Sequence, residues 1–130
     1  MFELTINNKV YPFNFGMGFM REINKSLSTN IDGVKDAKKN IGLRYKVLLV
    51  MDGDIEALVD ILDCANKGQT PRVTRNDLDA YIDDENTDID KLCEEVLDFL
   101  RNSNATKKTI AAMEKAVEEE KARAAAAANA

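Results

Sequence analysis

Apolar and polar residues alternate over residues 2–15, in the pattern of a β-hairpin. The pair Asn7-Asn8 in the middle of this pattern tolerates the positive φ angles of a two-residue type I′ turn. Such a turn pairs Leu4 with Tyr11 and places the apolar residues of both strands on one face. Because an isolated hairpin is only marginally stable in water, we expect this aromatic face to pack on the helices that follow.

From residue 17 onward, apolar residues recur three and four positions apart, which is the spacing of amphipathic helices. The helices that this spacing predicts have the approximate bounds 17–27, 43–51, 55–65, 75–82, 89–100 and 105 onward. The helix over 89–100 has the cleanest amphipathic pattern, and we expect it to lie in the centre of the core. Residues 26–40 contain few apolar anchors, and we expect a long mobile loop there.

Short polar residues mark several helix starts. Asp54, Thr74 and either Thr87 or Asp88 precede apolar stripes. A side-chain oxygen at such a position accepts a hydrogen bond from a free backbone N–H of the first turn. Gly53 can adopt the left-handed conformation that ends the helix before it.

The last helix carries large apolar residues only in its first turns. Ile110, Met113 and Val117 are three and four positions apart, whereas residues 118–130 contain only Glu, Lys, Arg, Ala and Asn. A helix without an apolar face has nothing to bury, so we expect this end to project into solvent. The sequence therefore predicts a mainly α fold with an N-terminal β-hairpin (α+β), with a compact domain over residues 1–117 and an alanine-rich helix or tail over 118–130.

The charge balance argues against nucleic acid as a partner. The net charge is −5, and affinity for DNA or RNA depends mainly on Lys and Arg. The short basic stretch Lys35–Lys39 lacks interleaved aromatic residues, and we interpret it as solvated. No apolar run approaches the roughly 20 residues that span a bilayer, so we expect no membrane association. Cys64 and Cys93 lie among apolar helical neighbours and are interpreted as small core residues in a reducing cytoplasm.

The residue types offer little for catalysis. His is absent, and with it the commonest general base near neutral pH and the Ser-His and Cys-His arrangements. Gly16-x-Gly18 lacks the third glycine of a dinucleotide fingerprint, and no P-loop motif occurs. We therefore predict that the protein is not an enzyme and has no cofactor.

Residues 84–95 imitate an EF-hand calcium loop, with Asp, Asn or Glu at its first, third, fifth, seventh and twelfth places. The sixth place, however, holds Ile89 instead of Gly, and the eighth holds Lys91 instead of an apolar residue. Ile89 also belongs to the apolar stripe of the next helix. We interpret the segment as an acidic first turn that complements the helix dipole, with a calcium site as the alternative.

A dense acidic segment extends from Asp77 to Asp98, with ten carboxylates and a single Lys. Most such runs are solvated faces, and some are docking surfaces for basic proteins. This segment supports the alternative function of a small acidic adaptor domain that binds a basic protein partner.

Several short strings, taken together in their order and spacing, resemble one family. They are residues 11–16 (YPFNFG), 19–24 (FMREIN), 52–54 (DGD), 65–67 (ANK), 71–74 (PRVT), 94–100 (EEVLDFL) and 104–108 (NATKK). Over residues 2–117 the chain resembles the tail assembly chaperones of long-tailed (siphovirus-type) phages and prophages of Gram-positive bacteria. The alanine-rich end departs from this resemblance.

The resemblance implies an assembly factor of the host cytoplasm that is absent from the mature virion. Such a chaperone coats and solubilises the tape measure protein in many copies and helps to recruit tail tube subunits. The tube contact is expected to involve a longer product made by frameshifting. As contact residues we select Ile110, Met113 and Val117, because their stripe lies on the helix least committed to the core. The alternative is that this stripe simply packs on the domain.

Overall fold

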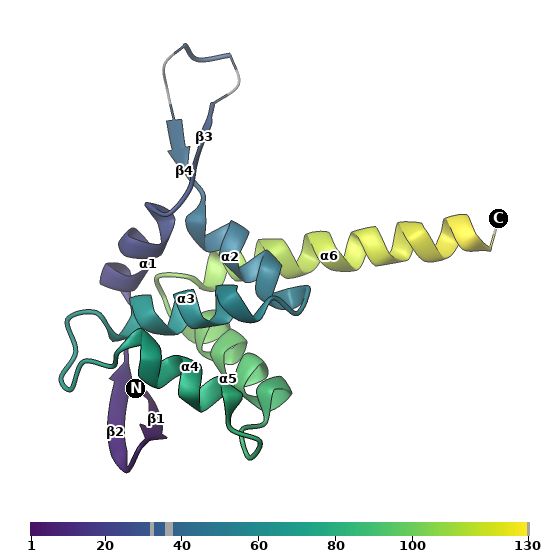
Figure 1. Ribbon diagram of the computed structural model, residues 1–130. Helices are drawn as coiled ribbons and strands as arrows, with labels where there is room; N and C mark the ends of the chain where they lie inside the picture. Colours follow the sequence, from purple (N-terminus) through teal and green to yellow (C-terminus); the bar gives the residue numbers. More distant parts are fainter. Residues whose placement is uncertain (32, 36–37, 130) are drawn as a thin grey trace.

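The computed structural model describes residues 1–31, 33–35 and 38–129. An N-terminal hairpin and five helices form the body, and the long last helix projects from it (Figure 1). The elements in chain order are β1 (Phe2–Ile6), β2 (Lys9–Phe13), α1 (Met17–Asn24), β3 (Ser28–Asn30), β4 (Lys38–Asn40), α2 (Gly42–Met51), α3 (Ile55–Asn66), α4 (Arg75–Asp83), α5 (Ile89–Asn102) and α6 (Lys107–Ala128). The predicted fold class is confirmed.

The N-terminal hairpin has the predicted register. β1 and β2 pair antiparallel with Leu4 opposite Tyr11, and both residues of the turn have positive φ, 53° at Asn7 and 64° at Asn8. The apolar face is buried, as the marginal stability of a free hairpin requires. The Phe2 ring lies 5.1 Å from the ring of Phe99 on α5, so the hairpin packs on a helix that is distant in sequence.

Helix α3 occupies the centre of the body and packs against α1, α2, α4 and β2 (Figure 1). The expectation that residues 89–100 form the central helix is therefore wrong. The physical reason lies in the distribution of apolar residues around α3. Its buried residues are Ala57, Leu58, Val59, Ile61, Leu62, Ala65 and Asn66. Apolar residues that surround most of a helix require neighbours on several sides, whereas the single stripe of α5 needs them on one.

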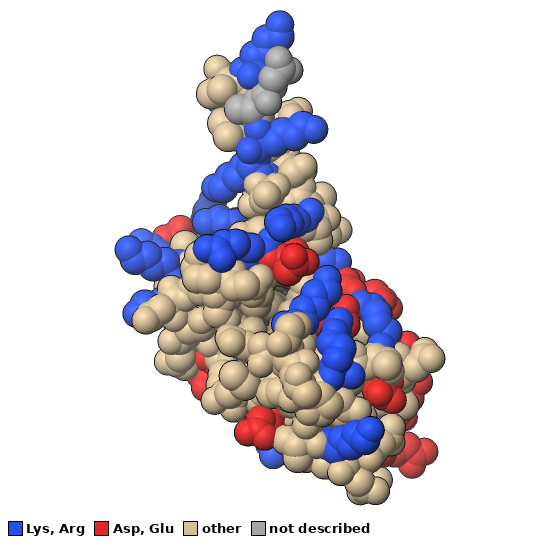
Figure 2. All heavy atoms as spheres, turned by 90° about the vertical axis from the view of Figure 1, so that its left-hand side faces the viewer, with Lys and Arg blue, Asp and Glu red and all other residues tan. Residues whose placement is uncertain are grey.

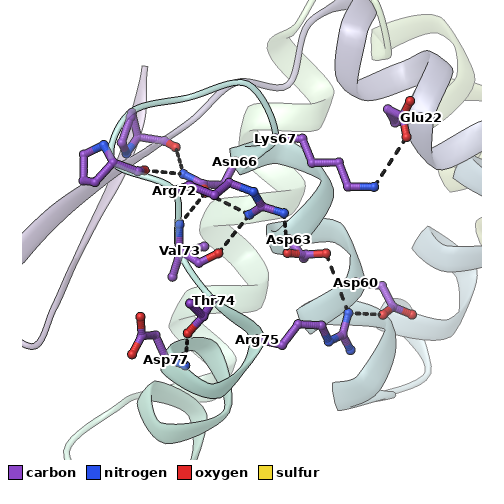
Figure 3. Close-up of polar contacts among 12 residues, drawn as sticks. Glu22, Asp60, Asp63, Asn66, Lys67, Arg72, Val73, Thr74, Arg75 and Asp77 are labelled. Atoms are coloured by element: carbon purple, nitrogen blue, oxygen red, sulfur yellow. Dashed lines mark hydrogen bonds and ion pairs between the residues drawn. The ribbon is translucent and has the colours of Figure 1, made fainter.

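Asn66, the last residue of α3, connects three segments through its buried amide (Figure 3). Its Nδ2 donates to the carbonyl oxygens of Pro12 at 2.8 Å and Pro71 at 3.2 Å. Its Oδ1 accepts from the backbone N–H of Val73 at 2.7 Å and from Arg72 at 2.9 Å. Both donors and both acceptor sites of the amide are therefore used. β2 and the α3–α4 connection are fixed to the end of α3 in this way.

Asp60 on α3 joins two neighbouring helices through ion pairs. Its carboxylate lies 2.7 Å from Lys46 Nζ on α2 and 2.7 Å from Arg75 Nη1 on α4, and Figure 3 shows the Arg75 contact. Partial burial by itself raises the pKa of Asp60, but the hydrogen bonds from Lys46 and Arg75 outweigh this effect, so the pKa is lower than usual.

The segment over residues 26–40, expected to be a long mobile loop, contains a second hairpin. β3 and β4 pair antiparallel with Thr29 opposite Lys39, and Ile41 N–H donates to the Leu27 carbonyl at 2.8 Å. Asp32, Asp36 and Ala37, in the connection between the strands, lie outside the described residues. The strands are only three residues long and contain no buried side chain, which is why hydrophobic periodicity did not reveal them.

Helix α1 ends at Asn24, three residues earlier than predicted. The hydroxyl of Ser26 donates to the Ile23 carbonyl at 2.6 Å, and Asn24 Oδ1 accepts from the first turn of α2, at Leu43 N–H, at 3.0 Å. A Cβ at Gly42 would collide with the Ile23 carbonyl oxygen and the Ser26 hydroxyl, so only Gly permits this close approach of the two helices.

The predicted helix caps are confirmed. Asp54 accepts from Ala57 N–H at 2.9 Å, and Thr74 accepts from Asp77 N–H at 3.0 Å. Of the two residues considered for α5, Asp88 is the cap, and the helix begins at the next residue. Gly53 has the expected positive φ, at 88°.

Removal of the Asn66 amide tests whether this residue holds the fold together. We expect Asn66→Ala to lower the free energy of unfolding by about 2–4 kcal/mol, because each buried group left without a partner costs about 1–3 kcal/mol. Chemical denaturation measures the change. Asn76→Ala, at an exposed position of α4, is the control and should remain close to wild type. Equal stability of the two variants would contradict the assignment.

The ion pairs of Asp60 predict an acid-sensitive contribution to stability. Because the folded-state pKa is lowered, the contribution is fully present above the unfolded carboxyl pKa of about 4 and is lost as the pH falls through the lower folded-state value. We expect Asp60→Asn to be less stable than wild type at neutral pH and this difference to shrink below about pH 4. Denaturation curves recorded across this pH range measure it, with Asp79→Asn as the control.

Candidate binding groove between α2 and α6

The three residues predicted to contact a partner differ in how deeply they are buried. Ile110 is completely buried and Met113 is 8% exposed, so the first two turns of α6 pack on the body. Val117 is half-buried, and the part of α6 beyond it is exposed as far as residue 129. Ile110 is therefore unavailable to a partner, whereas Met113 and Val117 line an apolar groove between α2 and α6.

An apolar groove of about 420 Å³ lies between α2 and α6. Its lining comes from residues 44–48 of α2 and residues 112–120 of α6, together with the residue that precedes α2. The lining residues are Ile41, Arg44, Tyr45, Leu48, Ala112, Met113, Ala116, Val117 and Glu120. Arg44 and Glu120 are the only charged members of this lining, so the groove offers a partner mainly apolar surface.

Helix α2 contributes to the groove because it has two apolar faces. Leu43, Val47 and Val50 are buried against the body. Tyr45 and Leu48 lie on the other side, and each is 45% exposed. With Ile41 they follow the spacing i, i+4, i+7, which is a second helical stripe visible in the sequence. This second stripe was not predicted, because it lies on the same short helix as the apolar residues that face the core.

Arg101 on α5 fixes the position of α6. Its Nε lies 3.0 Å from Oε1 and 3.1 Å from Oε2 of Glu114, and its Nη1 lies 2.9 Å from Glu94. The hydrogen bonds to Glu114, and then to Glu94, raise the pKa of Arg101. At the start of α6 the buried hydroxyl of Thr106 donates to the Leu100 carbonyl at 2.7 Å. The α6 wall of the groove is therefore held at a defined place.

A second hollow, of about 320 Å³, adjoins the groove. Leu48 and Val117 line both, so these two side chains stand between them. The second hollow also contains Arg101, Glu114 and Lys121 and is more polar. Leu48 and Val117 therefore present apolar surface to both hollows.

The calcium-like segment and the two cysteines have structural roles or surroundings that explain them. Asp88 of the calcium-like segment caps α5, and Asp84 accepts a hydrogen bond from Asn86 N–H at 2.9 Å. In the part of the chain that the structure describes, no group of three or more acidic or Cys side chains is placed to hold a metal ion. Cys64 and Cys93 are half-buried, and burial raises the pKa of both thiols, which makes them less reactive.

Comparison with protein families identifies the chain. It matches the family of phage tail assembly chaperone proteins (TAC) over residues 3–115, which covers the body and the start of α6. The chain therefore belongs to this family. Its general role is in the assembly of phage tails, and membership of a chaperone family implies that this role is non-catalytic. Comparison with curated proteins gave no match, and comparison with solved structures gave none either. Among the described helices, none combines the length and apolarity needed to cross a membrane.

The division of α6 into buried and accessible residues can be measured. We expect Ile110→Asp to unfold the protein, because a carboxylate would replace a completely buried apolar side chain. Leu48→Asp changes a side chain that is already 45% exposed, and its melting temperature should remain close to wild type. Circular dichroism during heating compares the two variants. A stable Ile110→Asp variant would show that this part of α6 does not belong to the core.

Proposed function

We propose that this tail assembly chaperone coats and solubilises the tape measure protein, and that the α2–α6 groove binds apolar helical segments of that protein. The groove carries the proposal, because it is apolar, has a defined shape and lies on the surface of a protein whose family acts in tail assembly. An amphipathic helix that places apolar residues at i, i+3 or i+4, and i+7 in such a groove is a common mode of recognition.

The size of the groove implies many copies for each tape measure protein. Full burial of a large apolar side chain contributes about 1.5–3 kcal/mol, and only a few such side chains border the groove. Association itself costs several kcal/mol, so one groove holds one segment weakly. A long client therefore requires many chaperones side by side.

We further propose a role for the C-terminal residues of α6 and a cellular setting for the protein. Residues 118–130 form a unit separate from the body over 1–117, and a frameshifted longer product extends α6 and contacts the tail tube protein. The exposed surface of α6 beyond Val117 supports this role. The chaperone acts in the cytoplasm of a Gram-positive host and leaves before the virion of the siphovirus-type phage is complete.

Co-expression with the tape measure protein tests the coating function. Wild type should keep the tape measure protein in the soluble fraction, and the double variant Tyr45→Asp/Leu48→Asp should not, because charges would then line the groove. Met17→Asp is the matched control, since Met17 is 46% exposed and lies outside the groove lining. The soluble fraction is measured by gel densitometry, and circular dichroism verifies that every variant is folded.

Salt dependence separates this function from that of an acidic adaptor. Apolar contacts in the groove should withstand about 1 M salt, at which the Debye length is about 3 Å. An adaptor that binds a basic partner through its carboxylates would release it. Loss of the tape measure complex at high salt, or a folded groove variant that solubilises as well as wild type, would overturn the proposal.

A further inference from the structure

The two charged residues of the α2–α6 groove have opposite signs and lie on opposite walls. Arg44 belongs to the α2 wall and Glu120 to the α6 wall, and both are exposed. The rest of the lining is uncharged. Figure 2 shows a different face of the molecule, on the α1 side, where charged side chains are numerous and Lys and Arg gather towards the β3–β4 end. One positive and one negative charge on an otherwise uncharged lining therefore distinguish the groove from that face.

The two walls also differ in the size of their side chains. Ala112 and Ala116, one turn apart on α6, are exposed and present only methyl groups. Tyr45 and Leu48 on α2 are larger, and each is 45% exposed. Because the distance between packed helices depends on the side chains at the contact, the two alanines let a bound helix lie close to α6. Its other side then contacts Tyr45 and Leu48.

A helix bound in such a groove has two flanks, one beside each wall. If its apolar stripe occupies positions a and d of a heptad, the residues at e and g lie on either side of the stripe. Turning the helix end for end exchanges these flanks. A helix with one acidic and one basic flank therefore has a single direction in which both flanks meet an opposite charge. In the other direction both flanks meet a like charge, which is unfavourable.

We propose that the groove selects amphipathic helical segments with an acidic flank beside Arg44 and a basic flank beside Glu120, and that these two residues fix the direction of the segment. Charge complementarity identifies this occupant. The apolar lining attracts any amphipathic helix, whereas two opposite charges on the walls discriminate among such helices. This selectivity rests on the proposed function of the groove and adds a charge pattern to the segments of the tape measure protein that bind there.

Glu120 has a competing contact on its own helix. Its carboxylate lies 3.5 Å from the guanidinium of Arg123, and the two side chains are 74% and 73% exposed. Exposed pairs of this kind contribute little, so a basic residue of the bound helix can replace Arg123. For the same reason each matched pair with the bound helix should change its affinity by about two- to fivefold. The charges thus set direction and selectivity, while apolar contacts provide most of the affinity.

Three synthetic helical peptides test this selectivity with the purified full-length protein. All have Leu at a and d. The mixed peptide has Glu at e and Lys at g, the acidic peptide has Glu at both, and the basic peptide has Lys at both. Compensating charges at the outward positions b, c and f give all three the same net charge, and each is verified to be monomeric. Fluorescence anisotropy at low ionic strength measures the affinities, and wild type should bind the mixed peptide most tightly.

Charge reversal in the groove should change the preference in a defined order. Arg44→Glu leaves two acidic groups, so the basic peptide should become the tightest ligand, and Glu120→Arg should favour the acidic peptide. The double variant Arg44→Glu/Glu120→Arg restores opposite charges and should favour the mixed peptide again, now in the reverse direction. A nitroxide at the N-terminus of that peptide should then broaden a different set of amide signals of the protein from the set that it broadens in wild type.

Arg21→Glu and Glu119→Arg are the matched controls, because they make the same changes in net charge at exposed positions outside the groove lining. Both should keep the preference of wild type. Three results would each overturn the proposed selectivity: equal affinity of wild type for the three peptides, a control that changes the preference as much as a groove variant does, or an unchanged peptide direction in the double variant.

Two further measurements separate this selectivity from the proposed function. At about 1 M salt the preference should disappear while the peptides stay bound, because salt screens only the ionic contribution. Ala112→Leu/Ala116→Leu fills the groove with good helix formers and should prevent binding of all three peptides. If this variant binds as tightly as wild type, the groove is not the site and the proposed function fails too. If it loses binding but wild type shows no preference, only the selectivity fails.

Discussion

The four hydrogen bonds of the Asn66 amide are the constraint on which the arrangement of the elements depends. The hairpin, the central helix and the α3–α4 connection meet at this one side chain, which lies in the interior. Apolar packing alone allows surfaces to slide, since it has no preferred direction. A fully satisfied buried amide has one geometry, because any shift leaves a donor or an acceptor without a partner. Asn66 thus turns the collapse of the aromatic hairpin onto α3 into one defined arrangement.

The groove is a consequence of that arrangement. With α3 in the centre, α2 packs on it through one apolar face and keeps a second face, with Tyr45 and Leu48, at the surface. Helix α6 lies beside this second face of α2. The ion pair between Arg101 on α5 and Glu114 on α6 holds α6 in this position. A chaperone needs accessible apolar surface that does not itself unfold or aggregate. Here the exposed side chains of Tyr45 and Leu48 lie on α2, whose opposite face is buried in the core.

Particular residues show how far sequence patterns extend. The N-terminal register followed from alternation and the Asn7-Asn8 turn, because strand pairing across a two-residue turn is a local property. The β3–β4 hairpin was not predicted, because all side chains of its strands are exposed and the sequence there shows no alternation of apolar and polar residues. Ile110 and Val117 look equivalent on one stripe, yet one is buried and the other half-buried, since only the neighbouring helices decide where the core ends along α6.

The sequence by itself determined the mainly helical fold, the first hairpin, the helix caps and the absence of His-based chemistry, because each depends on residues close together in the chain or on composition. The tertiary structure decided which helix is central, which of the α6 residues remain accessible and that Tyr45 and Leu48 border a groove. These features depend on contacts between residues far apart in sequence. The same periodic pattern on a helix is compatible with a buried face or a binding face until its neighbours are placed.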